Sequence, residues 1–362
     1  VFDVTHMGVF DLQGPGAAAF LDAVTTNDVP GLPVGNSHYT YLLDVDGIPL
    51  DDLMIYRLAE EHYLLVVNAS NNDKNWGWLN AVKRHRVMID TDDPTRTVEG
   101  SDGFTLRDLR DPAAGREMRV DVALQGPRST DILLSLGGSD NDSQAVKKLT
   151  WAGITRANLG GFDLIVSRTG YTGERAAYEL FVHPDEAPAL FQALVEAGAT
   201  PCGLAARDSL RTEAGLPLYG HELAGPLNLG PADAGFGQYV KIWKPFFVGR
   251  AAHIRREAAR EAEMVRFRLN AKGARPPHQG DPLVDGKGRV VGIVTSCSID
   301  SDGYQLGQAY VKHDYRAEDT ALAVFSGASR GKPVDPGSAS LGSRITVPDE
   351  VTVLSRFPKR KR

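Results

Sequence analysis

The sequence predicts a protein of mixed helices and strands that ends in a smaller unit built only of strands. Strand-like runs alternate with amphipathic helical stretches over residues 1–250. From residue 262 onward, short runs alternate apolar with polar residues and are separated by Gly and Pro, which is typical of a small all-β unit. The length of 362 residues allows two or three domains. We therefore predict two regions, residues 1–250 and residues 262–357.

Composition narrows the class of protein. The net charge is −6, with 46 acidic against 40 basic residues, whereas a general nucleic-acid binder usually carries a basic face. The only two cysteines, Cys202 and Cys297, provide neither a disulfide framework nor a CxxC site. The sequence contains no run of about 18 apolar residues, so it predicts no membrane span. We expect a cytoplasmic protein that binds neither nucleic acid nor a membrane.

Turn and capping signals place the elements of the first region. Residues 44–47 (DVDG) form a hairpin-type turn signal. Ser70 is expected to cap a helix that runs to about Arg84. A further helix opens at residues 184–186 and is closed by Gly198. The strands predicted in this region are residues 48–58, 63–67, 164–166 and 178–182.

The second region follows a charged helical stretch, residues 251–263, in which acids and bases lie at i,i+3 and i,i+4 spacing. Its predicted strands are residues 265–269, 290–294, 306–311, 321–325 and 345–354. The chain ends in four basic residues, Lys359–Arg362, which form either a solvated tail or a patch for an anionic ligand. The opening residues VFDVTHMG read as the interior of a strand, so we expect the start of the protein to lie upstream.

Several common catalytic motifs are missing from the chain. It contains no GxxxxGK[ST] and no usable GxGxxG, so the sequence does not support a nucleotide-phosphate loop. HExxH and GxSxG are also absent. The nine His residues are scattered along the chain. Any chemistry must therefore be carried by Asp, Glu and Arg, together with Tyr.

The first candidate group lies on the strand after the hairpin turn. Successive strand side chains point to opposite faces, so Asp51 and Asp52 cannot point the same way. Asp52 shares its face with Leu50 and Met54, where a carboxylate is costly unless something pairs with it. Two interpretations stay open: an acid near a turn at a strand edge, or a desolvated carboxylate held for a ligand.

The second candidate group is the loop 167–174, with the sequence SRTGYTGE. Gly170 and Gly173 bracket Tyr171, and two glycines allow the backbone to approach a ligand closely. An ordinary tight polar loop is the alternative. Glu179 follows on the next strand, and its side chain faces opposite to those of its two neighbours. One face of that strand therefore buries a polar side chain.

The third candidate group is a short helix bounded by Gly203 and Gly215. Arg207 and Arg211 lie four residues apart and share a face of this helix. Two guanidinium groups there need anionic partners. Those partners are either carboxylates of the protein itself or a ligand.

Taken in order, nine segments resemble the aminomethyltransferase family, whose best-known member is the T-protein of the glycine cleavage system. The ordered set spans nearly the whole chain, which makes it far more specific than any one motif. The matching segments are FDVTHMG, TTNDV, DGIPLDDL preceded by Tyr39, LLVVNAS, LQGP, SRTGYTGE, CGLAARDSLRTEAGLPLYGHEL, KPFFVGR and GIVTS.

The resemblance implies an α+β fold in a three-domain cloverleaf arrangement around a central folate opening, with a C-terminal small β-barrel. It also implies that part of the family's N-terminal region precedes Val1. By motif, Asp52 corresponds to the catalytic carboxylate. The positions that correspond to the family's tetrahydrofolate site are Tyr39, Asn68, Tyr171, Glu179 and Arg207. No metal is implied.

The expected activity is transfer of a one-carbon unit to N5 of tetrahydrofolate, with Asp52 stabilising the positive charge that develops on nitrogen. The donor stays open between the aminomethyl-lipoyl arm of H-protein and a small N-, O- or S-methylated compound. Three segments depart from the T-protein pattern: one extra residue before Tyr178, and residues 226–244 and 297–304. Trp243 and Tyr304 are either walls of an aromatic cage for an onium donor or ordinary packing aromatics.

Two other functions remain as alternatives. One is a folate-binding protein without transfer activity, as in the iron–sulfur-assembly relatives. Those relatives carry a KGCYxGQE-like motif, whereas residues 244–250 here contain no cysteine and Asp52 is kept. The other alternative is a folate-binding module of a larger oxidase or demethylase complex.

Overall fold

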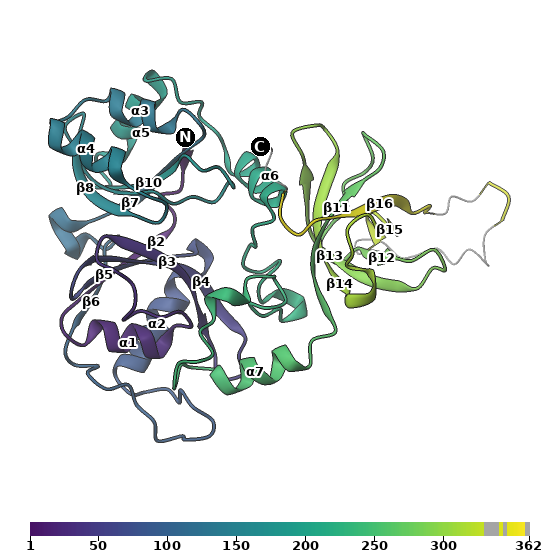
Figure 1. Cartoon of the computed structure of the whole chain (residues 1–362), viewed down its shortest axis with the longest axis horizontal. Coiled ribbons are helices and arrows are strands. Elements are labelled where there is room, and N and C mark those ends of the chain that lie inside the picture. Colours follow the sequence, from purple (N-terminus) through teal and green to yellow (C-terminus); the bar gives the residue numbers. More distant parts are fainter. Residues whose placement is uncertain (329–339, 343–345, 359–362) are drawn as a thin grey trace. The chain divides into compact units, whose positions relative to one another are not determined.

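The computed structural model describes residues 1–328, 340–342 and 346–358 and divides into two compact units (Figure 1). Unit 1 comprises Val1–Leu204 and Gln238–Arg255, and unit 2 comprises Ala205–Gly237 and Arg256–Arg362. The chain therefore leaves unit 1 after Leu204 and returns to it at Gln238. The basic run Lys359–Arg362 lies outside the described residues.

Unit 1 contains two five-stranded antiparallel sheets. The first has the strand order β3-β4-β5-β2-β6. Its strands are β2 (Gly8–Gln13), β3 (Asn36–Leu43), β4 (Pro49–Ala59), β5 (His62–Val67) and β6 (Thr105–Asp108). The strands predicted at residues 48–58 and 63–67 are β4 and β5. A tight turn at Gly47, whose φ of +74° suits glycine, joins β3 to β4.

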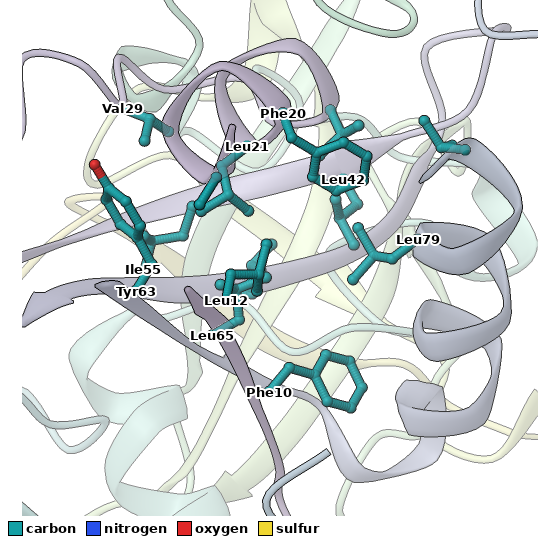
Figure 2. Packing of buried hydrophobic residues seen from close by; sticks show 14 of the residues in the cluster. Phe10, Leu12, Phe20, Leu21, Val29, Leu42, Ile55, Tyr63, Leu65 and Leu79 are labelled. Atoms are coloured by element: carbon teal, nitrogen blue, oxygen red, sulfur yellow. The ribbon is translucent and has the colours of Figure 1, made fainter. Parts of the chain in front are cut away.

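Two helices cover one face of this first sheet, α1 (Ala17–Val24) and α2 (Asn72–Lys83). The buried residues of α1, Ala17, Phe20, Leu21 and Val24, recur at helical spacing, so the helix packs one apolar stripe on the sheet. Figure 2 shows this core, in which Phe20 and Leu21 of α1 and Leu79 of α2 meet Phe10 and Leu42 of the strands.

The predicted cap of α2 is wrong. Ser70 lies inside a short 3-10 turn, Ala69–Asn71, and the residue at the N-cap of α2 is Asn71, which makes no capping bond with its side chain. The physical reason is that the Asn71 side chain donates instead to the buried carboxylate of Asp51, at 2.7 Å.

The second sheet of unit 1 has the order β1-β7-β10-β9-β8. Its strands are β1 (Phe2–Asp3), β7 (Val120–Gln125), β8 (Ile154–Leu159), β9 (Phe162–Ser167) and β10 (Ala177–Val182). The helices that pack on it are α3 (Ser129–Ser135), α4 (Asp140–Lys148) and α5 (Ala187–Glu196). The strands predicted at 164–166 and 178–182 are β9 and β10.

The remaining faces of the two sheets pack against each other. Val9, Tyr56 and Leu64 of the first sheet join Ile165 and Phe181 of the second in one buried cluster. The rings of Tyr56 and Phe181 meet edge to face with their centroids 5.4 Å apart, a separation within the usual range of about 4.5–7 Å for aromatic pairs. Unit 1 is thus layered as helices, sheet, sheet, helices (Figure 1). One face of β4 is directed toward α1 and α2, and the other face is directed toward the second sheet.

The returning segment closes unit 1 through a buried lysine. Lys244 is 1% exposed, and its Nζ donates to the carbonyl oxygens of Asp22, Thr25 and Asn27 at 2.6, 2.9 and 2.9 Å. It also pairs with the Asp22 carboxylate at 2.9 Å. These carbonyls lie at and just beyond the C-terminal end of α1, where a cation is favoured.

Unit 2 contains a closed antiparallel β-barrel in the order β11-β14-β13-β12-β15-β16, which leaves none of these strands with an open edge. The strands are β11 (Ala262–Leu269), β12 (Pro282–Val284), β13 (Val290–Ile299), β14 (Gln305–Lys312), β15 (Ala321–Val324) and β16 (Asp349–Leu354). The α+β class with a C-terminal small β-barrel is confirmed. The strand predicted at 345–354 begins at Asp349, and residue 345 lies outside the described residues.

Two helices lie near the junctions between the units, α6 (Leu204–Ala214) and α7 (Arg250–Ala258). The helix predicted to reach residue 263 ends at Ala258, because Ala262 already pairs with Lys312 in the barrel. The 3-10 turns are η1 (Ala69–Asn71), η2 (Pro112–Glu117), η3 (Gly225–Leu227), η4 (Gly237–Tyr239) and η5 (His313–Tyr315). Across the described ranges, no helix has the length and apolar character needed to cross a membrane.

Candidate active site

Strand β4 carries two adjacent carboxylates on opposite faces of the first sheet. Asp51 points toward α2, where it accepts hydrogen bonds from Asn71 and Asn75. Asp52 pairs across the ladder with Tyr41 of β3 and is partly exposed, whereas Asp51 is fully buried. Strand alternation places them in this way, so only Asp52 is open to a ligand.

Two side chains hold the carboxylate of Asp52. The Tyr39 hydroxyl donates to Oδ2 at 2.8 Å, and Asn68 Nδ2 donates to Oδ1 at 2.8 Å. Tyr39 reaches it diagonally from the neighbouring strand, and Asn68 comes from the residue that follows β5. Three of the residues predicted from the sequence are therefore in direct contact, and each oxygen of Asp52 is oriented by one donor.

Burial raises the pKa of Asp52 from 3.8 to about 7, and the negative charge of the neighbouring Asp51 adds to this rise. The hydrogen bonds from Tyr39 and Asn68 act in the opposite direction but do not cancel it. Asp52 therefore changes its protonation near neutral pH. An ionised carboxylate in such surroundings gains much from a positive charge placed beside it, which is the behaviour of a functional acid.

A network around Asp51 was missed in the sequence. Its Oδ1 accepts from Nδ2 of Asn68 and of Asn71, both at 2.7 Å. Its Oδ2 accepts from the backbone N–H of Asn68 at 3.1 Å and from the side chain of Asn75. The signal that could have revealed it is the run of asparagines at 68, 71 and 75, which directly follows a buried strand.

An aromatic cluster surrounds the Tyr39 ring. It meets the Tyr41 ring at 5.1 Å and the Tyr239 ring at 5.1 Å, both edge-on. Tyr239 is anchored by its carbonyl oxygen, which accepts from Thr26 Oγ1 at 3.2 Å. No sequence pattern pairs Tyr239 with Tyr39, because the returning segment joins unit 1 through tertiary contacts.

Glu179 lies on β10 and is tied to β4. Its Oε2 accepts from the Tyr56 hydroxyl at 2.7 Å and from Thr169 Oγ1. Its other oxygen, Oε1, has no protein partner among the residues that the structure describes. Tyr56 and Asp52 are four residues apart on the same face of β4, which corresponds to roughly 13 Å along the strand. The Glu179 carboxylate therefore has one oxygen, Oε2, that already accepts hydrogen bonds from the protein, and one, Oε1, that can accept from a ligand.

Tyr171 lies in the loop between β9 and β10, and its backbone N–H donates to Gln125 Oε1 at 3.2 Å. The preceding residue, Gly170, also has a packing reason to be glycine. A Cβ on Gly170 would lie 2.6 Å from Ala177 Cβ and 2.8 Å from Gln125 Oε1, so the glycine is required by packing within the sheet. Gly173, with a φ of +78°, is required by the turn itself.

The two arginines of α6 have different surroundings in unit 2. Arg211 is 1% exposed and pairs with Glu222 at 2.6 Å and with Asp208 at 2.6 Å. It also donates to Ser296 at 2.8 Å. Its partners are thus carboxylates of the protein, one of the two interpretations left open. Arg207 is partly exposed on the same helix, and it belongs to unit 2 whereas the other predicted site residues belong to unit 1.

The two candidate cage aromatics also differ. Trp243 is 66% exposed in unit 1. In unit 2 the Tyr304 ring already has two cations over it, Arg268 at 4.6 Å and Lys272 at 4.8 Å from the centroid. Within the described part of the chain, no group of three or more His, Cys, Asp or Glu side chains is arranged to hold a metal ion.

Comparison with known proteins identifies the family of the chain. The family model described as the GCVT N-terminal domain matches residues 1–244. The chain is 41% identical to an aminomethyltransferase of Streptomyces avermitilis over 333 residues, which is 89% of this chain and 80% of that protein. It is 36% identical to one of Chloroherpeton thalassium over 329 residues, covering 90% and 82% of the two chains.

The chain belongs to the aminomethyltransferase family. A solved structure, the glycine cleavage system aminomethyltransferase T from Bartonella henselae, matches with a TM-score of 0.76 and 27% identity, over 98% of this chain and 84% of that one. At the level of the family, this aminomethyltransferase is therefore an enzyme of the glycine cleavage T-protein type, and the family uses tetrahydrofolate.

Proposed function

We propose that this aminomethyltransferase transfers an aminomethyl-derived carbon from the lipoyl arm of H-protein to tetrahydrofolate, with Asp52 as its catalytic carboxylate. The observation that carries the proposal is the pair of hydrogen bonds to the Asp52 carboxylate: Tyr39 and Asn68 each donate to one of its oxygens at 2.8 Å. A carboxylate fixed in this way needs no reorganisation when charge develops next to it.

The residues of unit 1 fit the chemistry of a reduced pterin. Tetrahydrofolate supplies the N5 amine that accepts the carbon, and this nitrogen becomes positively charged as the new bond forms. Asp52 would stabilise that charge more in the transition state than in the ground state. Glu179 would accept a ring or exocyclic N–H through Oε1, because its Oε2 is already occupied by Tyr56 and Thr169.

The other predicted residues complete the proposed binding site. The amide nitrogen of Asn68 donates to the carboxylates of Asp51 and Asp52, so its side-chain carbonyl oxygen would accept a hydrogen bond from a ligand. Tyr39 and Tyr171 offer aromatic faces with polar tips. Arg207 of α6 supplies a positive charge, which suits the anionic glutamate tail or an acceptor on the pterin.

The donor is proposed from the relatives. The relatives compared above are named aminomethyltransferases, and the solved structure is named for the glycine cleavage system. A methylated small molecule is the competing donor. The aromatic cage that it would favour has less support, since the Tyr304 ring is already contacted by Arg268 and Lys272.

The test is incubation of the purified enzyme with tetrahydrofolate and either aminomethyl-loaded H-protein or a panel of N-, O- and S-methylated compounds. The folate product is identified by mass. Formation of 5,10-methylene-tetrahydrofolate with release of ammonia from H-protein supports the proposal. Formation of 5-methyl-tetrahydrofolate would identify a demethylase. Folate binding without turnover of any donor would point to a binding protein or to a module of a larger oxidase complex.

A further inference from the structure

We propose that Asp51 is a positioning residue of the active site: it orients the amide of Asn68, and through that amide it holds the catalytic carboxylate Asp52. The inference rests on the proposed function of Asp52. It assigns a task to a fully buried side chain that itself cannot touch a ligand, because it lies on the opposite face of β4.

The geometry at Asn68 supports this role. One nitrogen, Nδ2, donates to Asp51 Oδ1 at 2.7 Å and to Asp52 Oδ1 at 2.8 Å. The same nitrogen also donates to the Asp52 carbonyl oxygen at 3.1 Å, so the two N–H donors of the amide are both used, shared among three acceptors of which two are carboxylate oxygens. The reversed amide would place its carbonyl oxygen against two carboxylate oxygens and is excluded. Asp51 therefore helps to determine which end of Asn68 faces Asp52 and which end faces away.

Asp51 is itself held firmly enough to act as an anchor. It accepts four hydrogen bonds, three from the side chains of Asn68, Asn71 and Asn75 and one from the backbone of Asn68. These donors satisfy a carboxylate that would otherwise be costly to bury. These hydrogen bonds connect Asp51 of β4 to η1 and α2. The network extends to the exposed residue Lys74, whose Nζ donates to Asn71 Oδ1 at 3.0 Å.

Loss of Asp51 would change the pKa of Asp52 in two opposite ways: loss of its negative charge lowers that pKa, and loss of the Asn68 hydrogen bond raises it. A fall in kcat/KM in a folded variant therefore distinguishes a positioning role from a purely structural one. The charged and titratable groups around Asp52 are Asp51 on its own strand, Tyr39 and Tyr41 on β3, and Tyr239, which packs on Tyr39 from the returning segment. On α2, the charged residue Lys74 is connected to Asp51 through Asn71, to whose Oδ1 it donates a hydrogen bond. Among these groups, the negative charge of Asp51 raises the pKa of Asp52.

The experiment compares Asp51→Asn with a matched control, Asp11→Asn. Asp11 is another buried carboxylate of the first sheet, 1% exposed, and it accepts from His62 and Arg107 away from the site. The protonation midpoint of Asp52 is followed by carboxyl ¹³C NMR of Asp-labelled protein without substrate, and Asp52→Asn assigns the signal.

We expect Asp51→Asn to lower the Asp52 midpoint by ~1 pH unit, because a like charge is lost. We also expect kcat/KM to fall by about tenfold, because Asn68 is held less firmly. Asp11→Asn should leave the Asp52 midpoint in place even if it lowers Tm. Unchanged kcat/KM in a folded Asp51→Asn variant would overturn the inference whatever the midpoint does, and so would an equal loss of kcat/KM in Asp11→Asn.

A second measurement needs no substitution at Asp51. In the wild-type enzyme, both side-chain N–H signals of Asn68, assigned with Asn68→Ser, should be protected from solvent exchange and should shift with the ionisation of Asp52. Exchange at the rate of a free amide would overturn the inference. The readouts also separate the two proposals: full activity of Asp52→Asn would refute the proposed function, whereas the NMR results report on Asp51 without substrate.

Discussion

Replacing Asp52 with Asn removes the charge from the site and leaves its shape. The amide oxygen can still accept from Asn68, and the amide nitrogen can donate to the Tyr39 oxygen, so the local network has a way to persist. Loss of one preorganised electrostatic contact of this kind lowers kcat by ~10²–10³. We therefore expect transfer to fall by that factor while tetrahydrofolate still binds.

The same substitution should stabilise the protein at alkaline pH. The pKa of Asp52 is raised from 3.8 to about 7 in the folded state, which corresponds to a cost of up to ~4 kcal/mol for the ionised form. Since the folded state binds the proton more tightly than the unfolded state, this cost is absent below pH ~4 and is complete above pH ~7. Asp52→Asn removes it, so its gain in unfolding free energy should grow with pH across that window.

Two measurements check this reasoning. Single-turnover transfer to tetrahydrofolate gives the loss of rate, and urea unfolding at pH 4, 6 and 8 gives the difference in stability between variant and wild type. Near-normal turnover would remove Asp52 from the chemistry. A stability difference that does not vary with pH would show that the carboxylate is not strained by its surroundings.

Three further outcomes are expected. Tyr56→Phe removes one of two hydroxyl donors from Glu179 and should weaken tetrahydrofolate binding by about tenfold with little change in kcat, as measured by calorimetry and kinetics; an unchanged Kd would exclude Glu179 from the folate site. For the wild-type enzyme, kcat/KM should rise with pH and level off above pH ~7, because the catalytic carboxylate must be ionised; a flat profile from pH 5.5 to 8 would contradict this. Lys244→Met should cost about 3 kcal/mol of stability in urea unfolding, because it leaves Asp22 and three carbonyls without their partner. The neighbouring Lys241→Met serves as its control, because Lys241 is partly exposed and its side chain donates one hydrogen bond, to the carbonyl oxygen of Gln238.

Local rules were sufficient for much of unit 1. Strand alternation placed Asp51 and Asp52 on opposite faces, and turn signals located β4 and β5 to within a residue or two. The family resemblance then brought Tyr39 and Asn68 to Asp52, which the structure shows in direct contact. The roles proposed for these residues await the tests above.

The errors arose where a side chain has a distant partner. Ser70 satisfies the local preference for an N-cap, but the structure uses Asn71 there, whose amide is committed to Asp51. The charge pattern that favoured helix up to residue 263 is overridden by strand pairing at Ala262. No short window of sequence contains these partners.

The discontinuity of unit 1 bears on how the protein matures during synthesis. Domains generally fold from the N-terminus as the chain emerges, but here both sheets are complete long before Gln238 is made. Until that segment arrives, the Tyr39 ring lacks its contact with Tyr239, and the end of α1 lacks the Lys244 ammonium. A nascent chain halted at the end of α6 would therefore lack both contacts, and the surroundings of Tyr39 and of the end of α1 would be complete only after Lys244 is made.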